Sequence, residues 1–162
     1  MNAGRVLQRR ISGDYEVDEA GLDPDIAGLV APLLGLGWRI RVEGAEQLPA
    51  GPAVLVHNRV LGPPETFAVV RGVGLATGRR VRFLGIPDIA PVGPFLRKLG
   101  GGLAHPAELG GLLRAGELVA VGRRRGELPL SLAAVASELS VPIVPVSVRP
   151  GLLPGQWRVT IG

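Results

Sequence analysis

The sequence predicts a single α/β domain, with a mostly parallel sheet flanked by helices. Short apolar or alternating segments take turns with helical segments of about ten residues, which is the order typical of parallel sheets. The length of 162 residues is that of one ordinary domain. The 25 glycines and 15 prolines separate the apolar runs instead of clustering. This spacing is typical of turns and argues against disorder for most of the chain.

The chain begins with a polar segment and then a clear helix start. We expect residues 1–21 to be a poorly ordered lead-in, followed by the α/β domain at 22–162. Asp23 is a typical N-cap, and Pro24 suits the first position of a helix. Apolar residues at helical spacing then predict a helix over 26–34.

Two strand patterns follow. Residues 38–43 alternate between apolar and charged side chains, which predicts a half-buried strand near a sheet edge. Residues 52–57 are apolar almost throughout, which predicts a strand covered on both faces. The other predicted elements are helices at 64–73, 91–99, 106–115 and 129–139 and strands at 81–84, 117–121, 141–148 and 156–161.

The composition excludes several kinds of site. There is no cysteine, which excludes disulfides, zinc knuckles and a thiol nucleophile, and there are only two histidines. We therefore expect no metal site and no cofactor. The longest uncharged run of helical character, 26–38, is well short of the roughly 20 residues that span a bilayer. Residues 1–10 lack the apolar stretch of a secretory signal, so we expect a cytoplasmic protein.

The charge is mostly carried by arginine. The net charge is +4, and Lys98 is the single lysine among 18 basic residues. An apolar, arginine-rich chain without a spanning segment fits either a protein at a membrane surface or a subunit with a buried interface. Codon bias in a GC-rich genome would also produce this preference for arginine.

His57 ends the apolar strand 52–57, and Asn58 and Arg59 follow it. The carboxyl end of a parallel strand is where α/β proteins bind ligands. A histidine there can act as a general base, with Glu65 as the carboxylate that orients it. The alternative is a structural histidine that caps the end of the strand.

A basic run follows the predicted strand 117–121, and it comprises Arg123, Arg124, Arg125 and Gly126. Three arginines at the carboxyl end of a parallel strand are suited to hold a phosphate group. The alternative is a solvated charge run. We expect no nucleic-acid partner, because this is a single short basic run without interleaved aromatic residues.

From Asp14 to Gly162 the chain resembles the glycerolipid acyltransferase family, which acts on lysophospholipids and glycerol phosphate. The stretches that carry the resemblance are Asp23-Pro-Asp, Trp38-Arg-Ile-Arg-Val-Glu-Gly with the following residues to Val56, Arg82-Phe-Leu, Gly93-Pro-Phe-Leu-Arg-Lys-Leu-Gly, Pro106-Ala-Glu-Leu, Leu112-Leu-Arg-Ala-Gly-Glu-Leu-Val-Ala-Val, Pro142-Ile-Val-Pro-Val-Ser-Val and Arg158-Val-Thr-Ile-Gly. Their order and spacing, more than any single stretch, support the resemblance.

The resemblance implies an α/β domain that is peripheral to the inner face of the cell membrane. Such enzymes move an acyl chain from a thioester, acyl-CoA or acyl carrier protein, to a lysophospholipid or glycerol-phosphate hydroxyl. A histidine paired with an aspartate takes the proton from that hydroxyl. A later Phe-Pro-Glu-Gly motif helps to seat the glycerol phosphate.

Both motifs depart from the family pattern in this chain. The family has Asn-His, four further residues and then Asp, whereas here His57 precedes Asn58 and Arg59 stands at the histidine position. Gly62 or Pro64 occupies the position of the aspartate. Arginine stays protonated near neutral pH and is no general base. The run from Arg123 to Gly126 replaces Phe-Pro-Glu-Gly.

Two functions therefore follow from the resemblance. The first is a catalytically impaired, acyltransferase-like subunit that binds membrane lipid or a protein partner, such as an active homologue. The second is an active O-acyltransferase with His57 and Glu65 as a displaced catalytic pair. The predicted substrate-binding residues are Asn58, Arg59, Arg123, Arg124, Arg125 and Gly126. A soluble binder of an unrelated anion is a third class.

Overall fold

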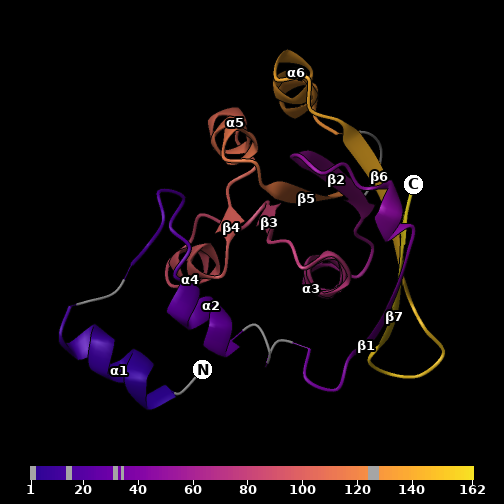
Figure 1. Cartoon of the computed structure of the whole chain (residues 1–162). Coiled ribbons are helices and arrows are strands. Elements are labelled where there is room, and N and C mark those ends of the chain that lie inside the picture. The colour runs from indigo at the N-terminus through magenta and orange to yellow at the C-terminus, as the bar shows by residue number, and fades with distance from the viewer. Residues whose placement is uncertain (1–2, 14–15, 31–32, 34, 124–127) are drawn as a thin grey trace.

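The computed structural model describes residues 3–13, 16–30, 33, 35–123 and 128–162. A seven-stranded sheet with the order β1-β7-β6-β2-β5-β3-β4 forms its centre. Neighbouring strands are parallel except for the antiparallel pair β6 and β7. The predicted α/β domain with a mostly parallel sheet flanked by helices is confirmed (Figure 1).

The described helices and strands follow one another in the predicted alternation. The helices are α1 (Ala3–Ile11), α2 (Pro24–Val30), α3 (Pro63–Thr77), α4 (Val92–Lys98), α5 (Pro106–Arg114) and α6 (Leu130–Glu138), with a 3-10 turn η1 at Ala45–Gln47. The strands are β1 (Arg39–Glu43), β2 (Ala53–Asn58), β3 (Val81–Leu84), β4 (Gly101–Gly102), β5 (Leu118–Arg123), β6 (Ile143–Pro150) and β7 (Gln156–Ile161).

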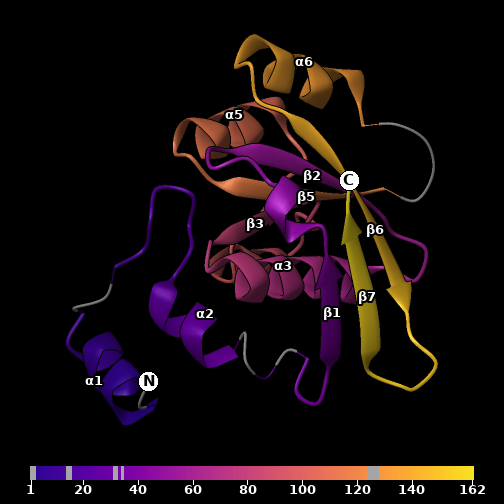
Figure 2. The ribbon, with the colours of Figure 1, turned by 45° about the vertical axis from the view of Figure 1, so that its right-hand side comes forward.

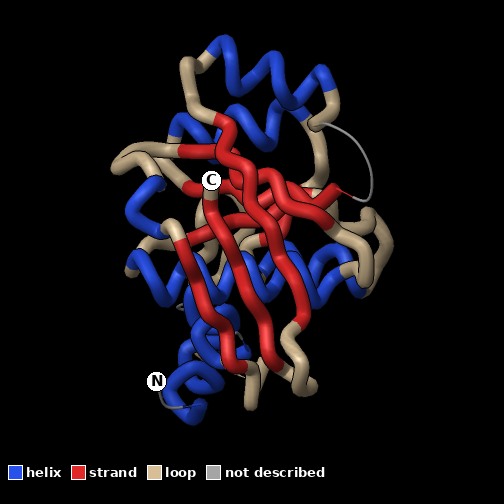
Figure 3. Tube along the Cα trace, turned by 90° about the vertical axis from the view of Figure 1, so that its right-hand side faces the viewer, coloured by secondary structure: helices blue, strands red, loops and turns tan. Residues whose placement is uncertain are grey.

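Helices cover both faces of the sheet, but unequally. Helix α3 packs on one face, where Val69 and Val73 join Leu55 and Val159 in a fully buried apolar cluster. Helices α5 and α6 pack on the other face over β2, β5 and β3, which buries a second cluster around Leu109 (Figure 2). No described helix lies over the β1, β7 and β6 part of that second face (Figure 3).

The two strand predictions that position the site are confirmed. Strand β1 lies at the sheet edge and alternates between exposed and half-buried residues. Strand β2 lies between β5 and β6 and is almost entirely buried.

The edge strand β4 was not predicted, because it is two glycines without a side-chain pattern. A Cβ on Gly101 would lie 2.6 Å from Ile86 and 2.8 Å from Phe83, so only glycine fits there without a shift.

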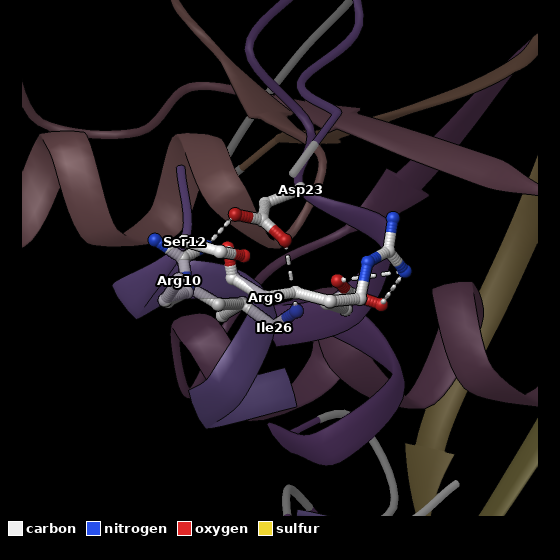
Figure 4. A network of polar contacts seen from close by, with 6 residues as sticks. Arg9, Arg10, Ser12, Asp23 and Ile26 are labelled. Atoms are coloured by element: carbon white, nitrogen blue, oxygen red, sulfur yellow. Dashed lines mark hydrogen bonds and ion pairs between the residues drawn. The ribbon is translucent and has the colours of Figure 1, made fainter. Parts of the chain in front are cut away.

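The amino-terminal segment differs from the expected lead-in. Helix α1 lies within 1–21, and its Arg10 donates to the buried Asp23 while Arg9 pairs with Asp25 at 3.2 Å (Figure 4). Long-range ion pairs of this kind are not visible in local sequence patterns. Asp23 also accepts a 3.0 Å hydrogen bond from the backbone of Ile26, which confirms it as the N-cap of α2 (Figure 4).

Helix α2 is described only as far as Val30, so the predicted continuation to residue 34 is not seen. Residues 31, 32 and 34 lie outside the described part of the chain. Within the described residues, no helix has the length and apolar character needed to cross a bilayer.

Candidate functional site

The predicted site residues meet at the carboxyl ends of two adjacent parallel strands. In the register of β2 and β5, His57 lies opposite Gly122 and Asn58 lies opposite Arg123. The backbone of Arg59 continues this pairing by donating a 2.7 Å hydrogen bond to the Arg123 carbonyl. The predicted residues Arg124, Arg125 and Gly126 lie outside the described residues.

His57 is buried at the end of β2, with 1% of its surface exposed. Its Nδ1 lies 2.9 Å from the carbonyl oxygen of Asn58, and because a carbonyl only accepts, Nδ1 is assigned the proton. The opposite ring nitrogen, Nε2, is buried and has no hydrogen-bond partner among the described residues. In the neutral ring this nitrogen carries the basic lone pair, as a general base requires.

Burial sets the protonation state of this ring. Loss of solvent lowers the pKa of His57 below its ordinary value of 6.5, and the neighbouring Arg59 lowers the pKa further. The hydrogen bond to the Asn58 carbonyl and the charge of Glu65 raise the pKa by less than burial lowers it, and the effect of Arg59 is the smallest of the four. His57 is therefore neutral at pH 7. The same burial leaves an acceptor hydroxyl no open approach to Nε2.

The His57 ring packs closely against Gly122. A Cβ at this position would lie 2.9 Å from Cε1 of His57 and 3.0 Å from Cδ of Arg59. The imidazole and the stem of the arginine therefore meet over the backbone of β5. Any residue larger than glycine would have to displace one of them.

Glu65 does not orient His57 through a hydrogen bond. Its carboxylate accepts from the backbone of Val60 at 3.0 Å, Leu61 at 2.9 Å and Gly62 at 3.0 Å. These bonds close the turn between β2 and α3, and they place a negative charge in the first turn of that helix, where it is favourable. The structure thus gives this residue a structural task, and the predicted His57–Glu65 dyad is not joined.

Asn58 is also engaged with the backbone. Its amide donates a 2.8 Å hydrogen bond to the carbonyl of Val148 and accepts a 2.7 Å hydrogen bond from the Val148 N–H. Both ends of the side chain are used to hold β6 against the end of β2. The structure therefore gives Asn58 a contact within the sheet, and its role in substrate binding stays a prediction.

Arg59 lines a cavity of about 370 Å³ beside the ends of β2 and β3. Its Nε is buried, and in the described part of the chain it has no hydrogen-bond partner. The wall is mostly apolar, with Thr66 as a further polar side chain, and its apolar residues include Phe67, Phe83, Leu84, Ile86 and Leu96. This volume is within the range of about 300–1,000 Å³ usual for small-molecule sites. An arginine on an apolar wall suits an amphiphile with one anionic group.

Sequence reasoning missed the cavity and the packing of the His57 ring against Gly122. The cavity combines residues of β3, α3 and α4, and nothing local in the sequence shows that these segments converge. Gly122 was not singled out from the sequence, although a glycine within a strand often marks a close approach by another part of the protein. Within the described residues, no three His, Asp or Glu side chains converge in a way that suits a metal ion.

Comparison with known proteins gives relatives without an assigned activity. No family model matches the chain. An uncharacterized protein of Mycobacterium tuberculosis strain H37Rv is 33% identical over 127 residues, covering 71% of this chain and 36% of the relative. An uncharacterized protein of Mycobacterium leprae is 33% identical over 132 residues, covering 71% of this chain and 35% of the relative. The chain thus spans about a third of the length of the curated relatives it matches.

Proposed function

We propose that this chain is a glycerolipid acyltransferase-like protein that is catalytically impaired and binds lipid or a protein partner at the cytoplasmic face of the membrane. The observation that carries the proposal is that the Glu65 carboxylate binds backbone groups. Both oxygens of its carboxylate are bound to backbone N–H groups, so within the described residues His57 has no hydrogen-bonded carboxylate partner.

The cavity beside Arg59 supports the lipid-binding part of the proposal. Its apolar wall suits an acyl chain, and the guanidinium suits a phosphate or carboxylate head group. A lysophospholipid combines these two parts in one molecule. The partner-binding part rests on the family resemblance, with an active homologue as the expected partner.

An active O-acyltransferase is the second candidate, and one observation favours it. The ring of His57 is held by Nδ1 while Nε2 is unpartnered, which is the arrangement of a base. In this reaction Nε2 takes the proton of the acceptor hydroxyl as its oxygen attacks the thioester carbonyl. A C–O bond forms, the C–S bond breaks, and the proton passes to the leaving thiolate. Movement of Arg59 away from the ring would be needed for access.

A measurement of acyl transfer by the purified chain decides between the impaired protein and the active O-acyltransferase. Labelled acyl-CoA and a panel of lysophospholipid and glycerol-phosphate acceptors are the substrates, and His57→Gln is measured alongside. The impaired protein gives no turnover with any acceptor while remaining folded. Turnover that disappears in His57→Gln would overturn this proposal in favour of the active enzyme.

Lipid binding is measured separately, with a labelled lysophospholipid below its aggregation concentration. Arg59→Gln should weaken binding by about tenfold, the usual cost of losing one charge-assisted hydrogen bond. Arg114→Gln is the matched control, because Arg114 is an exposed arginine of α5 that does not line the cavity. Equal affinities for the two variants would contradict the assignment of the cavity.

A further inference from the structure

The uncovered part of the sheet carries a row of arginines. Along β1, Ile40 and Val42 pack into the core, so Arg39 and Arg41 point to the opposite, solvent side. The same alternation turns Arg158 of β7 outward, and it lies opposite Arg41 in the register of the two strands. These arginines, with Glu43 at the end of β1, therefore lie on the sheet face that no described helix covers (Figure 3).

Strand β6 completes this row. Arg149 lies opposite Arg158 in the antiparallel pair, and both side chains are exposed. Three adjacent strands thus bring Arg41, Arg158 and Arg149 into one line, with strands spaced by about 4.8 Å. Like charges directly across a sheet repel one another, so the arrangement costs stability unless an anion offsets it. With Arg39, these residues line a hollow of about 580 Å³.

The arginines of this row have no acidic partner in the described part of the chain. None of Arg39, Arg41, Arg149 and Arg158 forms an ion pair within 4.0 Å or a side-chain hydrogen bond there. By contrast, the described arginines Arg82 and Arg97, near the opposite edge of the sheet, are paired with carboxylates. The charge of the row is thus open to an external anion.

Exposed leucines lie beside the row, where β1 and β7 begin and β6 ends. The turn between β6 and β7 presents Leu152, which is 100% exposed, and Leu153, which is 59% exposed. The segment before β1 presents Leu36 at 78%. The two segments are tied together by the 2.9 Å hydrogen bond from Arg39 N–H to the Gly155 carbonyl. Apolar tips beside a cationic face are the combination with which proteins lie on anionic bilayers.

We infer that this face, defined by Arg39, Arg41, Arg149 and Arg158 and called the arginine face, docks on the anionic surface of a membrane. Its arginines bind lipid phosphates, and Leu36, Leu152 and Leu153 enter the interface beside them. The inference deepens the membrane location in the proposed function by naming the contact surface. Asn58 joins the candidate site to Val148, the neighbour of Arg149, so docking would bring the site edge close to the lipid surface.

Vesicle sedimentation with the whole 162-residue chain tests the inference. The vesicles are phosphatidylcholine with or without anionic phosphatidylglycerol, at low and high salt. We expect binding to the anionic vesicles only, and weaker binding at high salt, because surface charges are screened. Arg41→Gln with Arg158→Gln should weaken the partition constant by at least about tenfold, given the usual contribution of each arginine near such a surface.

The control is the pair Arg80→Gln with Arg114→Gln. It removes the same charge from exposed arginines that lie outside the row, so binding should change by less than about twofold. Leu152→Ser with Leu153→Ser should also weaken binding without changing the salt dependence. Thermal unfolding of each variant separates loss of binding from loss of fold.

Three results would overturn the inference: no binding to anionic vesicles by the folded chain, equal loss in both arginine pairs, or displacement by millimolar glycerol phosphate. The last result would assign the arginine face to a soluble phosphate. Monomeric lysophospholipid binding, which depends on Arg59, needs no vesicle. Failure of docking and failure of the proposed lipid-binding function are therefore distinguished.

Discussion

The side chain of Asn58 pairs with both backbone groups of Val148, donating to its carbonyl and accepting from its N–H. Strand β2 ends at Asn58, and β6 continues two residues past Val148. The amide therefore takes the place of the next backbone unit of β2 and keeps β6 in register beyond the end of its neighbour. This role explains an asparagine at the strand end without a substrate.

Replacing Asn58 by alanine should destabilise the fold by about 2 kcal/mol, because two hydrogen bonds are lost and the backbone of Val148 is left unpaired. Urea unfolding measures the change. Ser12→Ala, which removes one exposed hydrogen bond to Arg9, is the control and should change stability by less than about 0.5 kcal/mol. A stable Asn58→Ala protein with lost lipid binding would instead assign Asn58 to the substrate.

Glu65→Ala should cost about 3 kcal/mol, since three backbone N–H groups lose the charged acceptor that they share. Glu65→Gln should cost less, because one carbonyl oxygen remains as an acceptor. Urea unfolding of both variants gives the comparison. A catalytic role would show the reverse pattern, with stability kept and acyl transfer lost in both variants.

The stability of the fold should fall when the pH is lowered through the ordinary histidine range. The pKa of His57 is lowered by burial from 6.5 in the folded state, so the unfolded chain binds more protons in this range. Unfolding then becomes easier from about pH 7 downward, until the pH passes below the folded-state pKa of His57. Urea midpoints between pH 5 and pH 7.5 measure the slope.

His57→Gln removes this group and should flatten the same curve. An unchanged slope in the variant would show that His57 is not the group responsible.

Gly122→Ala should destabilise the fold by about 1–3 kcal/mol, because its Cβ would meet the His57 ring at 2.9 Å and displace it. Gly111→Ala in α5 is a matched control. Its Cβ would meet nothing within 4 Å, so the change should raise stability by up to about 1 kcal/mol. Thermal unfolding of the two variants should therefore shift in opposite directions.

Local patterns were sufficient to predict most of the fold. The alternation in β1 and the continuous apolar run of β2 follow from how many faces of each strand are covered. Both patterns can be recognised from a few consecutive residues. The antiparallel pairing of β6 and β7 was not predicted, although the glycine-bearing turn 151–155 between the two strands is a local hairpin signal. Helix α1 was not predicted either, and the ion pairs that hold it to Asp23 and Asp25 join residues far apart in the sequence.

The position of the candidate site could be predicted from the sequence, but the contacts of its side chains could not. Its position at the strand ends followed from the general rule for parallel sheets, and the register confirms that Asn58, next to His57, and Arg123 end adjacent strands. The roles of Asn58 and Glu65 depend on which partner each polar atom finds, and those partners are backbone groups, which every residue carries. Sequence alone gives no sign of such a choice.

The two outermost strands limit how this protein can associate. Strand β4 is only two residues long, and β1 alternates its exposed positions as Arg39, Arg41 and Glu43. Short or charged outer strands resist the addition of a strand from another chain, and so resist aggregation through backbone pairing. A second polypeptide would therefore meet this protein through a helix or a sheet face, and a continuous intermolecular sheet is the least expected form of any complex.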